Sequence, residues 1–375
     1  MHGFPGGGRV LTKGPPLRGT DPLKPAEKKA VIAMSGGVDS SVAAALMREA
    51  GFRCIGVTMK LFSGESRCCS LADVNDARNV AFNLGIPHYV LNFTDEFGDR
   101  VIRRFVETYE RGETPNPCID CNRFIKFNLL LLRARQIDFD YLVTGHYARI
   151  EEDAGGGRFL LRKALDTKKD QSYVLYCLTQ EQLRALRFPL GGLTKEAVRR
   201  MAAERRFINA GKRDSQDICF VPAGNYGAFI EDYRGRRAAE GDIIGIDGRR
   251  LGRHRGLVRC TIGQRRGLGV AAGEPLYVTA KSTVDNTVTL GPEQSLYTRS
   301  LDARDLNLIA CERIEGPLRV TVKTRYLQKE QAALAEQTGE DRLHLEFNEP
   351  QRALTPGQAA VLYDGDYVVG GGTIC

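Results

Sequence analysis

The sequence predicts an α/β protein in which a Rossmann-like domain with a parallel sheet precedes a small central domain and an antiparallel β-barrel. Three observations lead to this prediction. Apolar runs and helix-like segments alternate from Lys29 onward, and a glycine- and serine-rich loop, 35–41, directly follows the first run. After Pro222, glycine-punctuated segments alternate apolar and polar residues. The first pattern is typical of a parallel sheet covered by helices, and the last of antiparallel strands.

Short apolar runs and amphipathic segments follow one another in the first half of the chain. Short runs of this kind are typical of buried strands, and a glycine after a helix pattern is a common helix end. The expected strands are 29–34, 52–60, 87–91 and 141–144, and the expected helices are 40–50, 72–84, 95–111 and 123–136.

The second half predicts antiparallel strands of a small barrel or sandwich. The segments with this pattern are 241–248, 275–280, 286–291, 318–326, 344–350 and 364–375. Before Lys29, a Gly- and Pro-rich basic stretch shows no period, and we expect it to be disordered. The expected domains are a tail at 1–28, a nucleotide-binding catalytic domain at 29–222, a central domain at 223–292 and a barrel at 293–375.

Composition excludes several classes of protein. The chain has 375 residues, ten cysteines and a net charge of +8. It contains no apolar stretch of about 18 residues that would span a membrane and no signal peptide, so we expect a cytoplasmic protein with reduced thiols. In a reducing compartment, clustered cysteines indicate metal binding or thiol chemistry. A basic surface attracts RNA, DNA or anionic membranes, and charge alone does not choose among them.

The loop SGGVDSS, 35–41, lies between an expected strand and helix. Its glycines let the backbone approach a ligand, and the helix N-terminus offers N–H groups to a phosphate. Asp39 is a candidate Mg²⁺ ligand or a helix cap. The loop 35–41 is not a Walker loop, because no lysine follows its glycines. Alone, the loop is also compatible with a simple turn.

Two cysteine motifs suggest thiol chemistry. In TPNPCIDCNRFIKF, 114–127, Cys121 lies near the start of a basic helix, where the helix dipole and cations favour the thiolate that sulfur transfer requires. The Cys118–Cys121 pair is also compatible with a metal site or a transient disulfide. In KRDSQDICF, 212–220, Cys219 again has cationic neighbours. A buried structural thiol is the simpler interpretation of a lone cysteine.

These motifs resemble known families. SGGVDSS resembles the pyrophosphate loop of the ATP pyrophosphatases, which is shared by several synthetases and tRNA thiolases. From Lys29 to the C-terminus, the ordered motifs resemble the tRNA-specific 2-thiouridylase family, whose members lie within that superfamily. The matching segments are SGGVDSS, TPNPCIDCNRFIKF, TGHYAR (144–149), KKDQSYVLY (168–176), KRDSQDICF, TIGQRRGLG (261–269), VKTRY (322–326) and TPGQ (355–358).

The resemblance implies that ATP adenylates the 2-oxygen of the wobble uridine in tRNAs for Lys, Glu and Gln, and that a cysteine persulfide then supplies sulfur. It implies Cys219 as the persulfide carrier and Cys121 as its partner thiol. The implied nucleotide site is Ala33, Met34, Ser35, Gly36, Gly37, Val38, Asp39, Ser40, Met59 and Gly145. The implied tRNA contacts are Asn116, Pro117, Cys118, His146, Lys169, Asp170, Gln171, Arg325, Tyr326 and Gln358.

The chain departs from the family at Cys118, where many members have an aspartate proposed to act as acid or base. Asp120 is a candidate substitute with different geometry. Cys118, Cys121 and Cys219 together suggest an alternative mechanism, because three cysteines can hold an iron–sulfur cluster with one iron open to sulfide. We favour the persulfide mechanism, because it is the one that the family resemblance implies. The adjacent Cys68 and Cys69 are interpreted as structural.

Two other functions stay open at this stage. An amide-forming ATP pyrophosphatase would need no cysteine, and a non-catalytic tRNA-binding module would need no ATP. For the thiolase, we expect ATP and Mg²⁺ as cofactors and tRNA as a partner. We also expect a sulfur donor protein, either a desulfurase or a relay protein. No membrane partner is expected, and the protein is expected to be a monomer.

Overall fold

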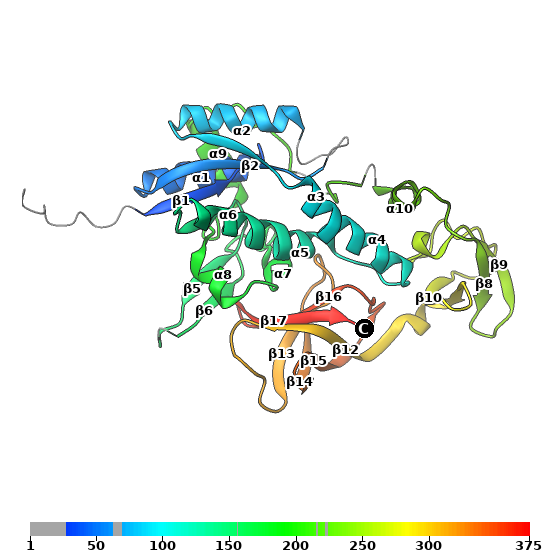
Figure 1. Cartoon of the computed structure of the whole chain (residues 1–375). Coiled ribbons are helices and arrows are strands. Elements are labelled where there is room, and N and C mark those ends of the chain that lie inside the picture. Colours follow the sequence, from blue (N-terminus) through cyan, green and yellow to red (C-terminus); the bar gives the residue numbers. More distant parts are fainter. Residues whose placement is uncertain (1–27, 63–69, 156, 215–216, 222–223) are drawn as a thin grey trace, which may run out of the picture.

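The computed structural model describes residues 28–62, 70–155, 157–214, 217–221 and 224–375. Almost all of the predicted tail, and the pair Cys68 and Cys69, lie outside the described residues. Figure 1 shows three parts: an α/β unit, a small unit around β8–β10, and a barrel that carries the C-terminus. Helix α5 lies where the α/β unit faces the barrel.

The α/β unit is built on a parallel sheet with the strand order β3-β2-β1-β4-β7. Side chains alternate between its faces, as the pleat requires. On β1, Ala30 and Ile32 pack with α1, α2 and α9, whereas Val31 packs with the helices of the other face. The strands are β1 Lys29–Ala33, β2 Arg53–Lys60, β3 His88–Asn92, β4 Tyr141–Val143 and β7 Leu186–Arg187. The helices of the first face are α1 Val38–Glu49, α2 Leu71–Asn83 and α9 Lys195–Glu204.

Two long helices cover the second face, and each contains a π-helical segment. The first, predicted at 95–111, consists of α3 Thr94–Phe97, η1 Gly98–Ile102 and α4 Arg103–Glu110. The second consists of α5 Pro117–Asp120, η2 Cys121–Leu129 and α6 Leu130–Gln136. The predicted start of the second helix at residue 123 was wrong. Asn116 caps the helix and Pro117 occupies its first turn, a position that proline favours, so both cysteines of the motif lie inside it.

The central unit corrects one strand direction. Its sheet has the order β10-β11-β8-β9, and β8 runs parallel to β11, although all strands here were predicted to be antiparallel. Alternation of apolar and polar residues gives a strand its faces but not its direction. The elements are α10 Tyr226–Arg234, β8 Gly241–Gly245, β9 Arg250–His254, η4 Leu257–Arg259, β10 Tyr277–Ser282 and β11 Thr287–Gly291.

The C-terminal strands form the predicted antiparallel barrel. They pair in the order β12-β15-β14-β13-β16-β17, and β12 also pairs with β17, which closes the sheet. A hairpin of the α/β unit, β5 Arg149–Glu152 and β6 Phe159–Arg162, joins β17 through the pair Arg162 and Tyr367. The barrel elements are η5 Glu293–Leu296, β12 Tyr297–Leu308, β13 Leu318–Lys323, β14 Gln331–Gly339, β15 Arg342–Arg352, β16 Ala359–Asp364 and β17 Tyr367–Ile374.

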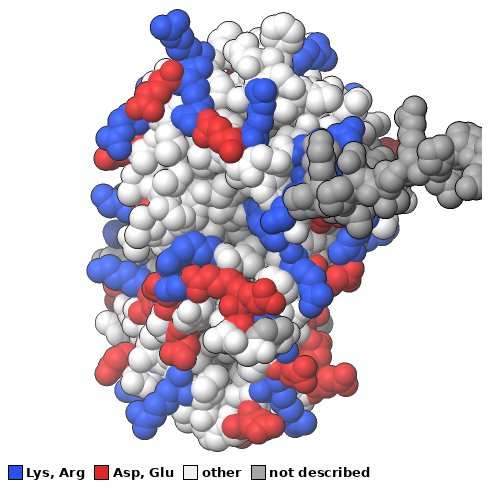
Figure 2. Space-filling model, turned by 90° about the vertical axis from the view of Figure 1, so that its left-hand side faces the viewer, with Lys and Arg blue, Asp and Glu red and all other residues white. Residues whose placement is uncertain are grey.

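Charged side chains of both signs are interspersed on the face beside β1, β5 and β6 (Figure 2). Several of them are paired: Arg162 contacts Glu151 at 2.7 Å and Asp366 at 3.2 Å. The net positive charge is therefore not gathered into one basic surface on this face. Within the described part of the chain, no helix is long and apolar enough to cross a bilayer.

Candidate active site

The predicted nucleotide residues gather at one edge of the parallel sheet. Because β1, β2 and β4 run in the same direction, their carboxyl ends meet there, which is where open α/β sheets bind ligands. Ala33 ends β1, Met59 lies next to the end of β2, and Gly145 follows β4. A Cβ added to Gly145 would lie 2.7 Å from the backbone nitrogen of Ser40. This segment therefore packs directly on the start of α1.

The loop after β1 presents the N-terminus of α1 at this edge. Gly36 has φ +73°, and a Cβ there would lie 2.2 Å from the carbonyl oxygen of Asp73, so the position requires glycine. Gly37 occupies the N-cap and has no side chain to satisfy the first N–H groups, which suits anion binding. Ser40 Oγ accepts from the Ser35 backbone nitrogen at 3.2 Å and donates to the Gly37 carbonyl at 3.1 Å.

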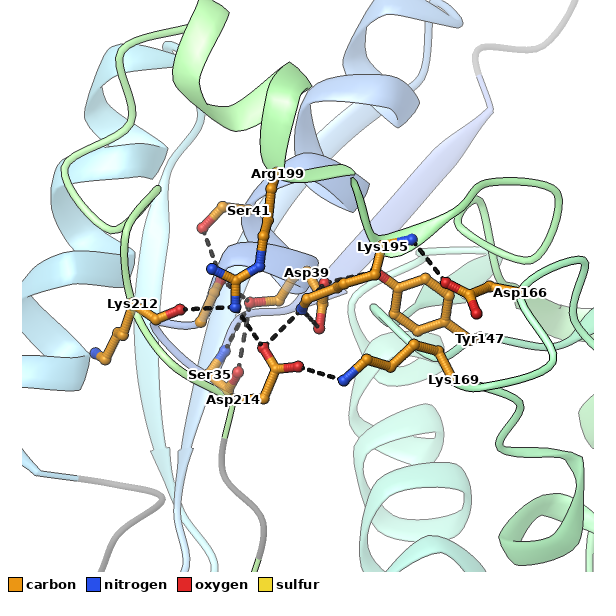
Figure 3. A network of polar contacts seen from close by, with 12 residues as sticks. Ser35, Asp39, Ser41, Tyr147, Asp166, Lys169, Lys195, Arg199, Lys212 and Asp214 are labelled. Atoms are coloured by element: carbon orange, nitrogen blue, oxygen red, sulfur yellow. Dashed lines mark hydrogen bonds and ion pairs between the residues drawn. The ribbon is translucent and has the colours of Figure 1, made fainter. Parts of the chain in front are cut away.

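A network of charged side chains lies beside the loop (Figure 3). The buried Lys195 Nζ donates to both Asp39 carboxylate oxygens, at 2.7 and 2.8 Å, and contacts Asp214 at 2.8 Å. Tyr147 Oη donates to Asp39 at 2.8 Å, and Lys169 Nζ donates to Asp214 at 2.7 Å. Burial raises the pKa of Asp214, but the hydrogen bonds from Lys169 and Lys195 outweigh it and hold that pKa at about 2. Lys195 is thus shared between two carboxylates.

Three side chains of this region had no role in the sequence analysis. Asn209 Nδ2 donates to the Gly36 carbonyl at 2.9 Å, and Lys212 Nζ donates to the same oxygen at 3.3 Å and to Asp73 at 2.6 Å. Lys195 is the third, and it begins α9. A cation at a helix N-terminus opposes the helix dipole. This unfavourable position of Lys195 was the one signal in the sequence that could have marked it as a functional residue. Lys212 and Asp214 belong to a quoted motif, but their contacts cross from one segment to another and leave no local trace.

Two of the three predicted sulfur residues, Cys118 and Cys121, lie at the start of the second long helix. Asn116 Oδ1 accepts from the backbone nitrogen of Cys118 at 3.2 Å, which caps the helix. Cys118 is exposed, whereas Cys121, one turn further along, is buried. Cys121 belongs to the large apolar cluster of the second sheet face, and the half-buried Cys219 packs against the same cluster. Both cysteines therefore adjoin the same extended apolar cluster, which reaches from the sheet to the barrel.

These cysteines do not form a metal site in the structure. Among the described residues, which include Cys118, Cys121 and Cys219, no group of three His, Cys, Asp or Glu side chains could hold a metal ion. That search concerns a single metal ion, so an iron–sulfur cluster on these three cysteines stays a prediction.

Asp120, the candidate substitute for the family's aspartate, has a charged partner within the protein. It forms an ion pair with Arg104 of α4 at 3.6 Å. Burial raises its pKa, against the opposing charges of Arg104 and Arg123. Its partners tie the start of one long helix to the other, which is a structural use of the carboxylate.

The charge of Cys118 acts on one tyrosine of the central domain and one of the barrel. Burial raises the pKa of Tyr326 to about 12, with contributions from the charges of Asp170 and Cys118. Burial likewise raises the pKa of Tyr226, with contributions from Asp217 and Cys118. Tyr226 begins α10 of the central domain, and Tyr326 belongs to the barrel. The exposed Cys118 is therefore within electrostatic range of a side chain from each of the other two domains.

Most of the predicted tRNA contacts already have partners within the protein. Gln171 Oε1 accepts from the Tyr147 backbone nitrogen at 2.9 Å. The buried Asp170 accepts from the Ala164 nitrogen at 2.9 Å. Arg325 donates to Thr355 Oγ1 at 2.7 Å. Their roles toward tRNA stay predictions.

His146 is held as a neutral side chain. Its Nδ1 lies 2.7 Å from Thr144 Oγ1, and its ring packs on Phe127 and Phe188. Burial, reinforced by the charge of Lys126, holds the pKa of His146 well below its ordinary value. A neutral ring can stack on a base or offer one hydrogen bond, and its part in tRNA binding stays a prediction.

Comparisons with known proteins agree with the three-part architecture. Residues 28–223 match the family described as "tRNA methyl transferase HUP domain", residues 227–292 the "tRNA methyl transferase PRC-barrel domain", and residues 298–374 the "Aminomethyltransferase beta-barrel domain". The tRNA-specific 2-thiouridylase MnmA of Acetivibrio thermocellus is 48% identical, over 93% of this chain and 99% of its own length. The protein of the same name from Clostridioides difficile is 48% identical, over 92% and 98%.

Solved structures give weaker likenesses. The U34-tRNA thiolase NcsA from Methanococcus maripaludis, with its 4Fe–4S cluster, is 19% identical with a TM-score of 0.35, over 57% of this chain and 66% of that one. A 4-thiouridine synthetase in complex with RNA and ATP is 18% identical with a TM-score of 0.35, over 51% and 44%. At these scores neither likeness bears on the chemistry of this chain.

Proposed function

The chain belongs to the tRNA-specific 2-thiouridylase family, and we propose that it thiolates tRNA through a persulfide on Cys219 with Cys121 as the second thiol. Members of the family use ATP to replace the 2-oxygen of a tRNA uridine with sulfur. One observation carries the assignment of residues. The segment 212–219 begins in the charged network, through Asp214 and Lys195 at 2.8 Å, and ends in the apolar cluster where Cys219 and Cys121 both pack. Asp214 and Cys219 are five residues apart in the sequence, and this closeness supports the proposal.

In the first half-reaction, the uridine 2-oxygen attacks the α-phosphorus of ATP and pyrophosphate leaves. The N–H groups at the start of α1 and the side chains of Lys195 and Lys212 are the proposed donors for the phosphates, because fixed donors and cations stabilise the charge that develops there. Both lysines are paired with carboxylates in the structure, so they are held close to the loop before ATP arrives. Adenylation converts the oxygen into part of a good leaving group, AMP.

In the second half-reaction, the outer sulfur of the Cys219 persulfide attacks C2 and AMP departs with the original oxygen. The Cys121 thiolate then attacks the Cys219 sulfur, which breaks the bond to the outer sulfur and leaves that sulfur on the base. The two cysteines end as a disulfide, having supplied the two electrons that reduce the transferred sulfur, and a thiol reductant restores them. The apolar cluster around Cys121 and Cys219 excludes water, which would otherwise hydrolyse the adenylate.

Other components follow the family rather than a feature of the structure. The carboxylates beside the loop, Asp39 and Asp214, are already neutralised by Lys195, so we assign neither as a Mg²⁺ ligand and propose only that Mg²⁺ accompanies ATP. The preference for tRNAs for Lys, Glu and Gln, a desulfurase or relay protein as the sulfur donor, a monomeric state and a cytoplasmic location stay predictions.

The test combines two products of one reaction. Purified protein is incubated with ATP, tRNA and a persulfide donor; AMP release is followed with time, and the tRNA is digested for nucleoside mass spectrometry. We expect tRNA-dependent AMP release together with 2-thiouridine. Binding of tRNA without AMP release would indicate a non-catalytic module. AMP release that yields an amide product and survives Cys219→Ser would indicate the amide-forming alternative.

A further inference from the structure

The loop that leads into the cysteine helix is held by the barrel. This loop joins α4 to α5 and contains Glu113, Thr114 and Pro115. On the barrel side, the turn 355–358 lies between β15 and β16. Gln358 of this turn contacts Thr114 and Pro115 of the loop, although they are more than 240 positions apart in the sequence. Pro115 lies three residues before Cys118. We call this set of contacts, formed by Glu113, Thr114, Pro115, Arg304, Pro356, Gly357 and Gln358, the barrel clasp.

Hydrogen bonds to the loop backbone form the centre of the clasp. Gln358 Nε2 donates to the Thr114 carbonyl at 2.8 Å and to the Pro115 carbonyl at 3.2 Å. In the other direction, the Thr114 backbone nitrogen donates to the Pro356 carbonyl at 2.8 Å. Because these bonds engage the main chain, they restrain the path of the loop itself rather than a mobile side chain.

An ion pair and a close backbone approach complete the clasp. Arg304 Nη2 on β12 donates to both Glu113 carboxylate oxygens, at 2.9 and 3.0 Å. Gly357 has φ +88°, and a Cβ there would lie 2.9 Å from both the Glu113 Cβ and the Thr114 backbone nitrogen. A side chain at position 357 would thus push the loop away from the barrel.

The barrel side of the clasp is rigidly built. The Gly357 nitrogen donates to the Ile374 carbonyl at 2.9 Å, and the Ile374 nitrogen donates to the Gln358 carbonyl at 2.8 Å. These bonds fasten the turn to the last strand of the closed barrel. The loop 113–115 therefore contacts a turn that is hydrogen-bonded to the closed barrel. The helix that carries Cys118 and Cys121 begins shortly after this loop.

We propose that the barrel clasp positions the cysteine helix for sulfur transfer, and that Gln358 acts mainly as a positioning residue within it. This inference rests on the proposed function of Cys121. It also gives Gln358 a use other than the tRNA contact that the family resemblance implies. The reacting sulfur and the adenylated base must approach closely, and a displacement of about 1 Å can cost a hundredfold in rate. Loosening the clasp should therefore slow sulfur transfer while tRNA still binds.

The test compares Gln358→Glu with the matched variant Gln337→Glu. Gln337 Nε2 also donates to two backbone carbonyls, Gly339 at 3.0 Å and Glu340 at 3.3 Å, but those lie within the barrel. For Gln358→Glu we expect the single-turnover rate of thiolation at saturating tRNA to fall about tenfold to a hundredfold. The tRNA Kd should change less than about twofold, because this inference has the Gln358 amide engage the loop backbone rather than the tRNA. Gln337→Glu should match the wild type in both.

Two further readouts separate positioning from other roles. Alkylation of the exposed Cys118, mapped by mass spectrometry, should change rate in Gln358→Glu and not in Gln337→Glu. If Gln358→Glu fails to fold, Arg304→Met and Arg304→Lys replace it, with partial recovery of the rate expected in the lysine variant. A weakened tRNA Kd with an unchanged rate at saturation would overturn the inference and leave Gln358 as a tRNA contact. Cys219→Ser with normal thiolation would instead overturn the persulfide assignment, whatever the clasp variants show.

Discussion

The nucleotide end and the sulfur end of the proposed active site are held together by different forces. At the nucleotide end, Lys195 joins Asp39 and Asp214, and Lys212 joins Asp73 to the loop carbonyl of Gly36. At the sulfur end, Cys121 and Cys219 pack in an apolar cluster that includes aromatic side chains. The ring centroid of Phe220 lies 5.6 Å from that of Phe97 and 5.2 Å from that of Phe105. One end is organised by charge and the other by packing.

The difference follows from what each end must do. A triphosphate needs fixed cations and N–H donors, and those stay ordered without ligand only when carboxylates balance them. A persulfide and an adenylate need protection from water, which apolar packing provides. Substitutions should accordingly act through charge balance at one end and through reactivity at the other.

The largest expected effect is at the sulfur end. Cys219→Ser and Cys121→Ser should each lower the rate of thiolation by at least about a thousandfold, because a serine hydroxyl cannot carry or release sulfur. ATP binding should be unchanged, since the charged network stays intact. Cys311→Ser, a half-buried barrel cysteine, is the control, and nucleoside mass spectrometry is the measurement. Equal losses in all three variants would point to a general effect of cysteine removal.

Lys195→Met tests the nucleotide end. Removing the shared cation leaves Asp39 and Asp214 facing each other, and breaking a buried pair of this kind costs about 3 kcal/mol of stability. ATP affinity should fall as well. Lys195→Arg should recover part of the stability, and the exposed Lys168→Met should change neither property. Denaturant unfolding and ATP titration provide the two measurements, and an unaffected Lys195→Met protein would show that charge balance does not organise this end.

Asp214 gives the nucleotide end a pH dependence. Its pKa in the folded protein, about 2, lies below its ordinary value of 3.8, so its stabilising effect is present above pH 4 and is lost as the pH falls toward 2. After discounting for partial exposure, the effect is about 1–2 kcal/mol. The difference in unfolding free energy between the wild type and Asp214→Asn should therefore shrink from pH 6 to pH 3. A constant difference across that range would contradict this origin.

Lys281 of the central domain contrasts with Lys195, because its partner is a neutral carbonyl rather than a carboxylate. Its Nζ donates to the Cys260 carbonyl at 3.0 Å, and burial lowers its pKa to about 8. The folded protein therefore binds this proton less tightly than the unfolded chain, and stability should rise with pH between 8 and 10.5. Lys281→Met should stabilise the protein at pH 7 by about 1 kcal/mol, after the lost hydrogen bond is subtracted. The gain should vanish near pH 10, as measured by thermal unfolding.

The sequence predicted most elements, and the glycine-containing loop between β1 and α1, because local rules determine them. The alternation of strand and helix predicted the parallel sheet, and parallel strands by themselves bring Ala33, Met59 and Gly145 to one edge. The cysteine helix was predicted to begin at residue 123 because the pattern of apolar residues becomes regular there, while the capping by Asn116 was overlooked.

Long-range contacts had no local signal. Lys195 reaches Asp39 across 156 positions, and Gln358 reaches Thr114 across 244. The first contact depends on how α9 packs against α1 within one domain, and the second on how the barrel docks on the α/β unit. The period of a segment encodes neither. The parallel pairing of β8 with β11 was missed because the alternation of apolar and polar residues does not determine strand direction.

The most direct test of the account is thiolation by iron-free protein. The protein is purified anaerobically, its iron and acid-labile sulfide are measured, and it is loaded with persulfide and given ATP and tRNA for a single turnover. We expect full formation of 2-thiouridine without iron, with a disulfide between Cys121 and Cys219 found afterwards by mass spectrometry. Thiolation that requires stoichiometric iron and is lost on changing Cys118 would contradict the account and establish a cluster mechanism.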